Sequence, residues 1–204
     1  MQETKPKKGL QGTTRKITVT AMLSAVAAVL MMLEFPVPLM PGFIKLDISE
    51  LPALLAAFSL GPVYGVAVCL VKNLIKLLTT NTGGVGELAN FTIGLFFVLP
   101  AGLIYKFRKT RGGAVAACLI GAAIMAIASL PINYYITYPV YTKFMPIEAI
   151  VGAYQAIRPG VNGLLECLIT FNIPFTFVKG LIDAILCFLI YKPLSQILHG
   201  RKRS

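Results

Sequence analysis

The chain contains few charged residues and lacks the sequence motifs of several common enzyme classes. Only 13% of its 204 residues are charged and 56% are hydrophobic, whereas soluble domains carry roughly 25% charged residues. His199 is the single histidine. The sequence therefore argues against a zinc site built from histidines and against histidine-based catalysis. The pattern GxxxxGK[ST] is absent, which excludes ATP binding through a P-loop of this chain.

The cysteines and acidic residues also argue against a catalytic or metal centre. The four cysteines lie far apart and form no CxxC pair: Cys69, Cys118, Cys167 and Cys187. We therefore predict small buried hydrophobic side chains rather than disulfides or metal ligands. The sequence also offers no pair of carboxylates of the kind that an intramembrane protease needs on facing helices. It predicts a protein that is not an enzyme and holds neither a metal nor a cofactor.

Long apolar segments are what the chain has instead. They cover residues 17–31, 51–71, 88–105, 114–136 and 171–191. Several approach the ~20 residues that a membrane-spanning helix needs. Helices are expected because the backbone cannot be left unpaired in lipid, and the alternating pattern of a membrane β-barrel is missing. The sequence thus predicts an all-α integral membrane protein with a single domain over residues 1–204.

Basic residues gather at three places along the chain. One group precedes the first apolar segment, a second lies at 106–111, and a third occupies 201–203. By the positive-inside rule all three are cytoplasmic. We therefore predict a basic cytoplasmic tail at each end, over 1–16 and 193–204. Orientation in the membrane explains these clusters better than binding of nucleic acid, so no nucleic-acid partner is predicted.

The pair Gly61-Pro62 decides the number of helices. Glycine commonly ends helices and proline begins them, so we expect a short helix over 50–60 and a longer one over 62–79. The total is six transmembrane helices with both termini inside. The expected outer segments are 34–48, 80–87 and 137–170. A helix of about eleven residues reaches only ~16 Å of a ~30 Å hydrocarbon core, so the second helix is a partial span that the preceding loop completes.

The residues that begin this short helix are unusually polar. Ser49 is expected to be its N-cap, Glu50 to favour the helix dipole, and Pro52 to occupy the third helical position. A helix start accounts for these residues without any ligand. The preceding apolar, proline-rich segment is not accounted for in this way, and it predicts a rigid wall or lid over a ligand pocket, with Leu46 and Asp47 in contact with the ligand.

Polar residues also interrupt the last apolar segment. Asn172, Thr176 and Lys179 are spaced by four and three residues and therefore lie on one helix face. Polar groups inside membrane helices are candidates for function because burying them in lipid is costly. Lys179 either contacts a ligand or pairs with Asp183, which lies four residues further on, and the sequence leaves both possibilities open.

Further candidates lie toward the outer side of the predicted helices. Asn133 and Tyr134 stand where the fifth helix leaves the membrane, and Asn90 begins the fourth helix as either a ligand contact or a cap. A set on the third helix suits either ligand or subunit contact: Lys72, Asn73 and Lys76. The inner halves of the helices are nearly all apolar. We therefore predict an occluded outer site in a protein that binds a solute and needs partners to move it.

Four segments in this order resemble the riboflavin-specific substrate-binding (S) subunits of energy-coupling factor (ECF) transporters. They are KLDISELPALLAAFSLGPVYGVAVCLVKNLIKLL, GELANF, NYYITYPVY and PFTFVKGLID. The resemblance runs from about residue 14 to 195. It implies six helices, a multi-pass protein of the bacterial cell membrane, and capture of riboflavin from outside. It also implies a transmembrane coupling (T) subunit and two ATPase (A) subunits as partners.

The resemblance assigns roles to particular residues. Asn133 and Lys179 match polar residues that contact the ligand in the family. Thr176 departs from the family pattern, where asparagine is expected, and Asn172 is placed to compensate. The AxxxA motif that docks these subunits on the coupling subunit is matched by Ala21 and Ala25.

The chemistry of riboflavin suits the candidate residues. Its isoalloxazine ring is planar, apolar in the middle and edged by carbonyl and N–H groups, and its ribityl chain carries hydroxyls. A pocket with Leu46 and aromatic faces as walls and a few amide and lysine donors fits such a ligand. Other readings that stay open are an S subunit for thiamine or pantothenate, a small membrane-embedded enzyme, and a stand-alone facilitator.

Overall fold

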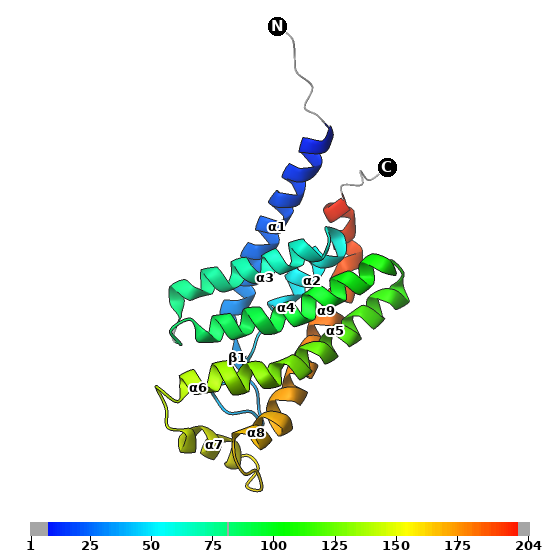
Figure 1. Ribbon diagram of the computed structural model, residues 1–204. Helices are drawn as coiled ribbons and strands as arrows, with labels where there is room; N and C mark the ends of the chain where they lie inside the picture. The colour runs from blue at the N-terminus through cyan, green and yellow to red at the C-terminus, as the bar shows by residue number, and fades with distance from the viewer. Residues whose placement is uncertain (1–7, 81, 200–204) are drawn as a thin grey trace.

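The computed structural model describes residues 8–80 and 82–199, and it is almost entirely helical (Figure 1). Its α-helices are α1 (Lys8–Met32), α2 (Glu50–Ser59), α3 (Pro62–Lys76), α4 (Val85–Phe107), α5 (Arg111–Ile132), α6 (Tyr138–Tyr141), α7 (Ile147–Gln155), α8 (Leu164–Cys167) and α9 (Ile173–His199). A 3₁₀ turn, η1 (Leu77–Thr79), follows α3, and two π-helical turns, η2 (Asn133–Thr137) and η3 (Leu168–Asn172), follow α5 and α8. Two short strands are β1 (Phe35–Pro36) and β2 (Lys45–Leu46). The predicted all-α membrane class is confirmed.

Helix α2 lies at the centre of the bundle. It packs against α1, α3, α4 and α9, while α5 packs against α4 and α9. Nine of its ten residues, from Glu50 to Phe58, are buried. Gly61 joins α2 to α3 with a φ of +120°, a conformation that favours glycine. The neighbouring helices approach so closely that a Cβ on Gly65 would lie 2.7 Å from the Ala53 carbonyl oxygen.

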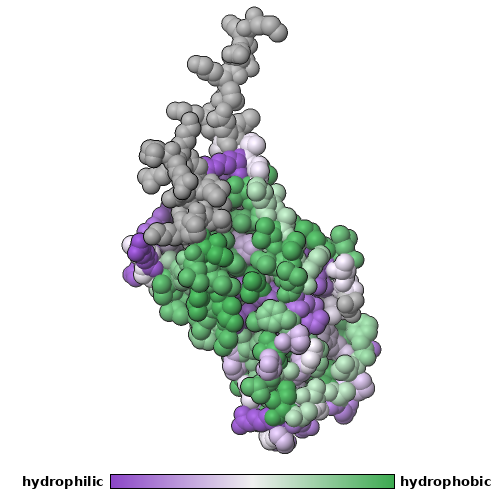
Figure 2. Space-filling view, turned by 180° about the vertical axis from the view of Figure 1, so that it is seen from behind, coloured by the Kyte–Doolittle hydropathy of each residue, from purple (hydrophilic) through white to green (hydrophobic). Residues whose placement is uncertain are grey.

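Five helical segments among the described residues are long and apolar enough to cross a membrane. They are Gly12–Met32, Pro62–Thr79, Val85–Phe107, Arg111–Tyr141 and Leu164–Ile190. Helix α2 is apolar but too short to span. The prediction was six transmembrane helices, with the short second helix as a partial span; the described residues contain five helices of spanning length and this shorter apolar helix, so the count of six spans is not confirmed. The face seen in Figure 2 is largely hydrophobic across its middle, as a surface in contact with lipid should be.

The start of α1 and the end of α9 lie at the same end of the bundle (Figure 1). This arrangement agrees with termini on one side of the membrane, and their cytoplasmic placement stays a prediction. Helical structure begins at Lys8 and continues to His199, inside both segments that were predicted as tails. Residues 1–7 and 200–204, with their basic side chains, lie outside the described residues.

The helices that flank the last outer connection are longer than the apolar pattern predicts. The fifth continues through η2 and α6 to Tyr141 instead of ending at 136, and the last begins at Leu164 instead of 171. In each case a π turn ends two residues before a proline, Pro139 or Pro174. A proline removes one helical hydrogen bond and its ring crowds the preceding turn. The wider π turn lets the helix continue past it.

The segment 34–48 contains a small antiparallel hairpin that its proline-rich sequence does not predict. Phe35 pairs with Leu46 and Pro36 with Lys45. Leu39, in the turn, adopts a positive φ of 69°. The hairpin gives this proline-rich segment a defined shape beside the bundle.

All four cysteines are buried free thiols, as predicted.

Candidate solute-binding site

A cavity of about 320 Å³ lies between the hairpin and the ends of several helices. Its volume is within the range of about 300–1,000 Å³ that is typical of small-molecule sites. Its walls are contributed by α1, the hairpin segment, α2, α3 with η1, α4, α5 with η2 and α6, and η3 with α9. Among the lining residues are Phe43, Ile44, Asp47, Glu50, Lys76, Glu87, Asn90, Ile93, Met125, Asn133, Tyr138, Asn172, Phe175, Thr176 and Lys179.

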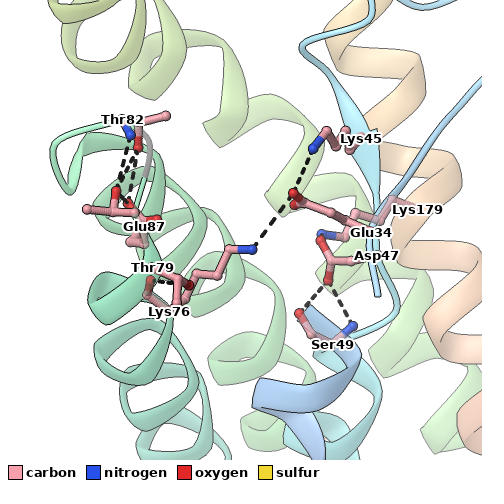
Figure 3. A network of polar contacts seen from close by, with 10 residues as sticks. Glu34, Lys45, Asp47, Ser49, Lys76, Thr79, Thr82, Glu87 and Lys179 are labelled. Carbon is pink, nitrogen blue, oxygen red and sulfur yellow. Dashed lines mark hydrogen bonds and ion pairs between the residues drawn. The ribbon is translucent and has the colours of Figure 1, made fainter. Parts of the chain in front are cut away.

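An ion pair closes one end of the cavity. The Lys179 ammonium donates to Asp47 Oδ2 at 2.8 Å and lies 3.1 Å from Glu50 Oε2. Asp47 Oδ1 accepts the backbone N–H of Ser49 at 2.9 Å and also the Ser49 hydroxyl. Figure 3 shows Lys179 reaching Asp47, with Ser49 on the other side of the same carboxylate. The hairpin segment, α2 and α9 are therefore joined by one charged cluster.

A second lysine supports this cluster from α3. Lys72 is fully buried, and its Nζ lies 2.6 Å from Glu50 Oε1 and 2.5 Å from Ser49 Oγ. Buried charges are tolerated when they are paired and hydrogen-bonded. Asn73 donates to the backbone carbonyl of Cys69 at 2.8 Å. Of the three polar residues on this helix face, Lys76 lines the cavity, whereas Lys72 and Asn73 make these internal contacts.

The structure decides two points about this region. Ser49 precedes α2 at the cap position, but its side chain makes no capping bond because Asp47 and Lys72 engage it. Lys179 does not pair with Asp183, although the spacing of four residues places both on one helix face. Within the described residues the buried Asp183 carboxylate has no hydrogen-bond partner. Helical spacing relates only residues within a few turns of each other, whereas Asp47 lies 132 residues away from Lys179.

The surroundings of Asp47 keep its carboxyl group ionised. Burial acts to raise the pKa of Asp47, but the positive charges of Lys179 and Lys72 outweigh it, helped by hydrogen bonds from Lys179 and Ser49. The resulting pKa is well below its usual value of 3.8. Asp47 is therefore a hydrogen-bond acceptor, and not a proton donor, at any physiological pH.

A second charged group borders the cavity on the side of α3 and α4. Glu34 Oε1 lies 2.8 Å from Lys45 Nζ and 3.8 Å from Lys76 Nζ. Glu87, near the start of α4, accepts the hydroxyls of Thr80 at 2.9 Å and Thr82 at 3.1 Å. Figure 3 shows Glu34 between the two lysines and Glu87 beside Thr82. The cavity thus offers both donors and acceptors on this side as well.

Aromatic hydroxyls hold one of the candidate amides in place. Tyr154 donates to Asn172 Oδ1 at 2.7 Å, and the Tyr138 and Tyr154 hydroxyl oxygens lie 2.5 Å apart. Burial, together with the adjacent Tyr138, raises the pKa of Tyr154, which therefore remains a protonated donor. Asn133 and Asn172 belong to the π turns η2 and η3, respectively, and both line the cavity.

The structure brings most of the predicted site residues to this cavity. Those that line it are Asp47, Asn90, Asn133, Asn172, Thr176 and Lys179. Asn90 is not a cap, because α4 begins earlier, at Val85. Leu46 and Tyr134 are not among the lining residues; Leu46 pairs with Phe35 in the hairpin, and Tyr134 packs edge-on against Tyr135 with ring centroids 5.0 Å apart.

Several lining residues were not predicted. Glu34 and Phe43 come from the hairpin segment, and Phe175 lies on α9 next to Thr176. The sequence did carry one signal for Glu34, since it is an acidic residue between an apolar helix and a proline-rich segment. The other two are ordinary apolar residues, and only the folded arrangement distinguishes them from core residues.

A partly open cavity that combines apolar side chains with buried donors and acceptors, held among membrane-length helices, defines a membrane-embedded solute-binding protein. The chain belongs to the family of ECF transporter substrate-specific components, whose family model matches residues 15–194. It is a multi-pass membrane protein of this transporter family.

Individual relatives agree with the family assignment. The chain is 35% identical to the riboflavin transporter RibU of Staphylococcus aureus (strain TCH60), over 94% of this chain and 96% of that protein. It is 32% identical to the riboflavin transporter FmnP of Bacillus subtilis (strain 168), over 92% and 96% of the two chains. A solved S component of a bacterial ECF transporter superposes with a TM-score of 0.73 at 33% identity, covering 91% of this chain and 98% of that one.

Proposed function

We propose that this protein is the riboflavin-binding subunit of an ECF transporter and captures riboflavin from outside the cell in the cavity beside the hairpin. The observation that carries the proposal is the contrast within that cavity between apolar walls and fixed polar groups. The relatives in S. aureus and B. subtilis, which are named riboflavin transporters, support the choice of ligand.

The parts of the cavity suit the parts of the ligand. Phe43, Ile93 and Phe175 supply apolar surface for the faces of the isoalloxazine ring. Lys179 is a donor, and the amides of Asn133 and Asn172 are both donors and acceptors, for its carbonyl and N–H edge. The hydroxyl-rich ribityl chain requires a polar environment, which residues such as Glu87 and Thr82 provide on the side of α3 and α4.

The protein acts as a binder in this proposal and not as an enzyme. Riboflavin is cargo, and no cofactor is needed. Transport is proposed to require a transmembrane coupling subunit and two ATPase subunits, as membership of the ECF family implies, and the chain contains no P-loop of its own. Ala21 and Ala25 are proposed to dock on the coupling subunit; both are exposed and lie one turn apart on α1. Small residues allow a partner helix to approach closely.

The absorbance spectrum of the detergent-purified protein tests the ligand. A flavin that co-purifies gives a yellow protein. When riboflavin is titrated with ligand-free protein, its fluorescence should be quenched, and the quenching should saturate at one riboflavin per protein. Thiamine and pantothenate are the matched competitors. Displacement of riboflavin by either, or a colourless protein that quenches nothing, would contradict the proposal.

Vesicles test the need for partners. Protein reconstituted alone should bind riboflavin without accumulating it, and uptake should appear when the coupling and ATPase subunits and ATP are added. Uptake by the chain alone would identify a stand-alone facilitator, and conversion of riboflavin to another compound would identify an enzyme.

A further inference from the structure

A second cavity, of about 310 Å³, lies where α2 ends, α3 begins and α4 ends. It shares no lining residue with the first cavity. Its lining comprises residues 57–64 together with Tyr105, Lys106 and Lys109. The two lysines belong to the basic segment 106–111, which the charge distribution predicts to be cytoplasmic.

Positive charge converges on this cavity from two separate parts of the chain. Lys106 and Lys109 line it directly, and Lys16 from α1 lies 5.6 Å from the ring centroid of Tyr64, another lining residue. The lining contains no acidic residue. Within residues 8–80 and 82–199, none of these three lysines forms an ion pair with a carboxylate. The cavity therefore has positive charge that the described part of the chain does not neutralise.

The walls and the surroundings of the cavity are apolar. Phe58 and Tyr105 pack against each other with ring centroids 4.6 Å apart. Val63 is 73% exposed at the edge of the cavity, and Phe107, next to Lys106 in the chain, is 82% exposed. Such side chains are stable at the surface of a membrane protein when hydrocarbon covers them. A ligand for this site should combine an anionic group with apolar chains.

We propose that this cavity binds an anionic phospholipid, with the phosphate between Lys106 and Lys109 and the acyl chains along Val63 and Phe107. Lysine is a common point-charge partner of phosphate, and lysine at a membrane interface attracts anionic lipids. The exposed apolar residues favour a lipid over free phosphate, which has no group to cover them. The proposal does not depend on which solute occupies the first cavity.

The test compares two double variants of the same connection. Lys106→Gln with Lys109→Gln removes the two lining charges. Arg108→Gln with Arg111→Gln removes two charges from neighbouring residues that do not line the cavity. Each purified protein is titrated with phosphatidylglycerol or phosphatidylcholine, and bound lipid is counted by native mass spectrometry. Inorganic phosphate, followed by thermal shift, is the arm that separates a free anion from a lipid.

The wild-type protein should bind one phosphatidylglycerol in preference to phosphatidylcholine and show no shift with phosphate. The lysine variant should bind phosphatidylglycerol about twenty-five-fold more weakly, roughly fivefold for each lysine. The arginine variant should change by less than about threefold. A thermal melt reports whether each variant remains folded. Lys106→Arg with Lys109→Arg should restore lipid binding if the glutamine variant is unstable.

Three results would overturn the proposal. An equal loss in both double variants would mean diffuse attraction to the basic segment. An equal thermal shift with phosphate would mean a free-anion site. Normal lipid binding in the lysine variant, together with weakened assembly with the coupling subunit, would mean that the cavity is a protein interface.

Discussion

Lys179 and Asp47 form a 2.8 Å ion pair inside the bundle although 132 residues separate them in the chain. The lysine belongs to α9, and the aspartate lies at the end of the hairpin segment. The pair therefore ties the segment that borders the cavity to a helix that supplies one of its lining lysines. We propose both a ligand role and a structural role for Lys179, and variants can separate them.

We expect Lys179→Met to weaken riboflavin binding about ten- to hundredfold, because a buried acceptor on the ligand would lose its donor at a cost of about 1–3 kcal/mol. The same change leaves Asp47 without its partner, which commonly costs about 3–5 kcal/mol of stability. Lys179→Met combined with Asp47→Asn should recover the melting temperature but not the affinity. Fluorescence quenching and thermal melts measure the two effects, and unchanged affinity in the double variant would remove Lys179 from the ligand site.

Asp183 should behave differently from the other buried acidic residues. Its carboxylate has no hydrogen-bond partner within the described residues, whereas Glu50 pairs with Lys72 at 2.6 Å. Asp183→Asn is therefore expected to leave the melting temperature unchanged or raise it, since it removes a buried acid that pairs with nothing. Glu50→Gln is the matched comparison and should lower it. Equal destabilisation by the two changes would show that Asp183 has a partner of its own.

Ala21 and Ala25 offer a test of assembly that is separate from binding. Replacing either with leucine should reduce co-purification of the coupling subunit, because a bulky side chain keeps a partner helix at a distance. Riboflavin affinity should not change, since neither residue lines the cavity. Val26→Leu is the control on the same helix, at an exposed position outside the motif. A docking face is contradicted if all three variants assemble equally well.

Single cysteines report the orientation of the chain. Lys109→Cys should be protected from a membrane-impermeant thiol reagent in intact cells, and Lys143→Cys, in the last outer connection, should react. Both residues are exposed, and the four native cysteines are buried, so background labelling should be low. Labelling of residue 109 from outside would reverse the predicted topology.

Local sequence signals predicted the central part of the fold well. The Gly61-Pro62 pair separates two helices that the structure places at Glu50–Ser59 and Pro62–Lys76, close to the predicted 50–60 and 62–79. This succeeded because the conformational preferences of glycine and proline act within a few residues. The helix ends near 136 and 171 were missed because the polar and aromatic residues there resemble a loop, while two π turns keep the helices continuous.

The candidate site was harder to predict because its contacts join distant segments. Polar residues within apolar helices could be recognised one by one, as for Asn133 and Lys179, since their burial in lipid is costly. Their partners could not, because helical spacing suggested Asp183 where the fold supplies Asp47 and Glu50. Leu46 and Tyr134 do not line the cavity, and the sequence could not show this because the side of the chain that each faces depends on the hairpin and on the π turn.

The ion pair between Lys179 and Asp47 also sets a condition for entry. A molecule that binds Lys179 must replace the hydrogen bond that the lysine already makes to Asp47. Its gain in binding free energy is therefore only the difference between its own hydrogen bonds to the lysine and that existing bond. Hydrocarbon chains and other purely apolar components of the bilayer could occupy the cavity but could form no hydrogen bond to replace the one between Lys179 and Asp47. The site can therefore remain selective in surroundings where apolar competitors vastly outnumber its substrate, because admission depends on trading one polar contact for another.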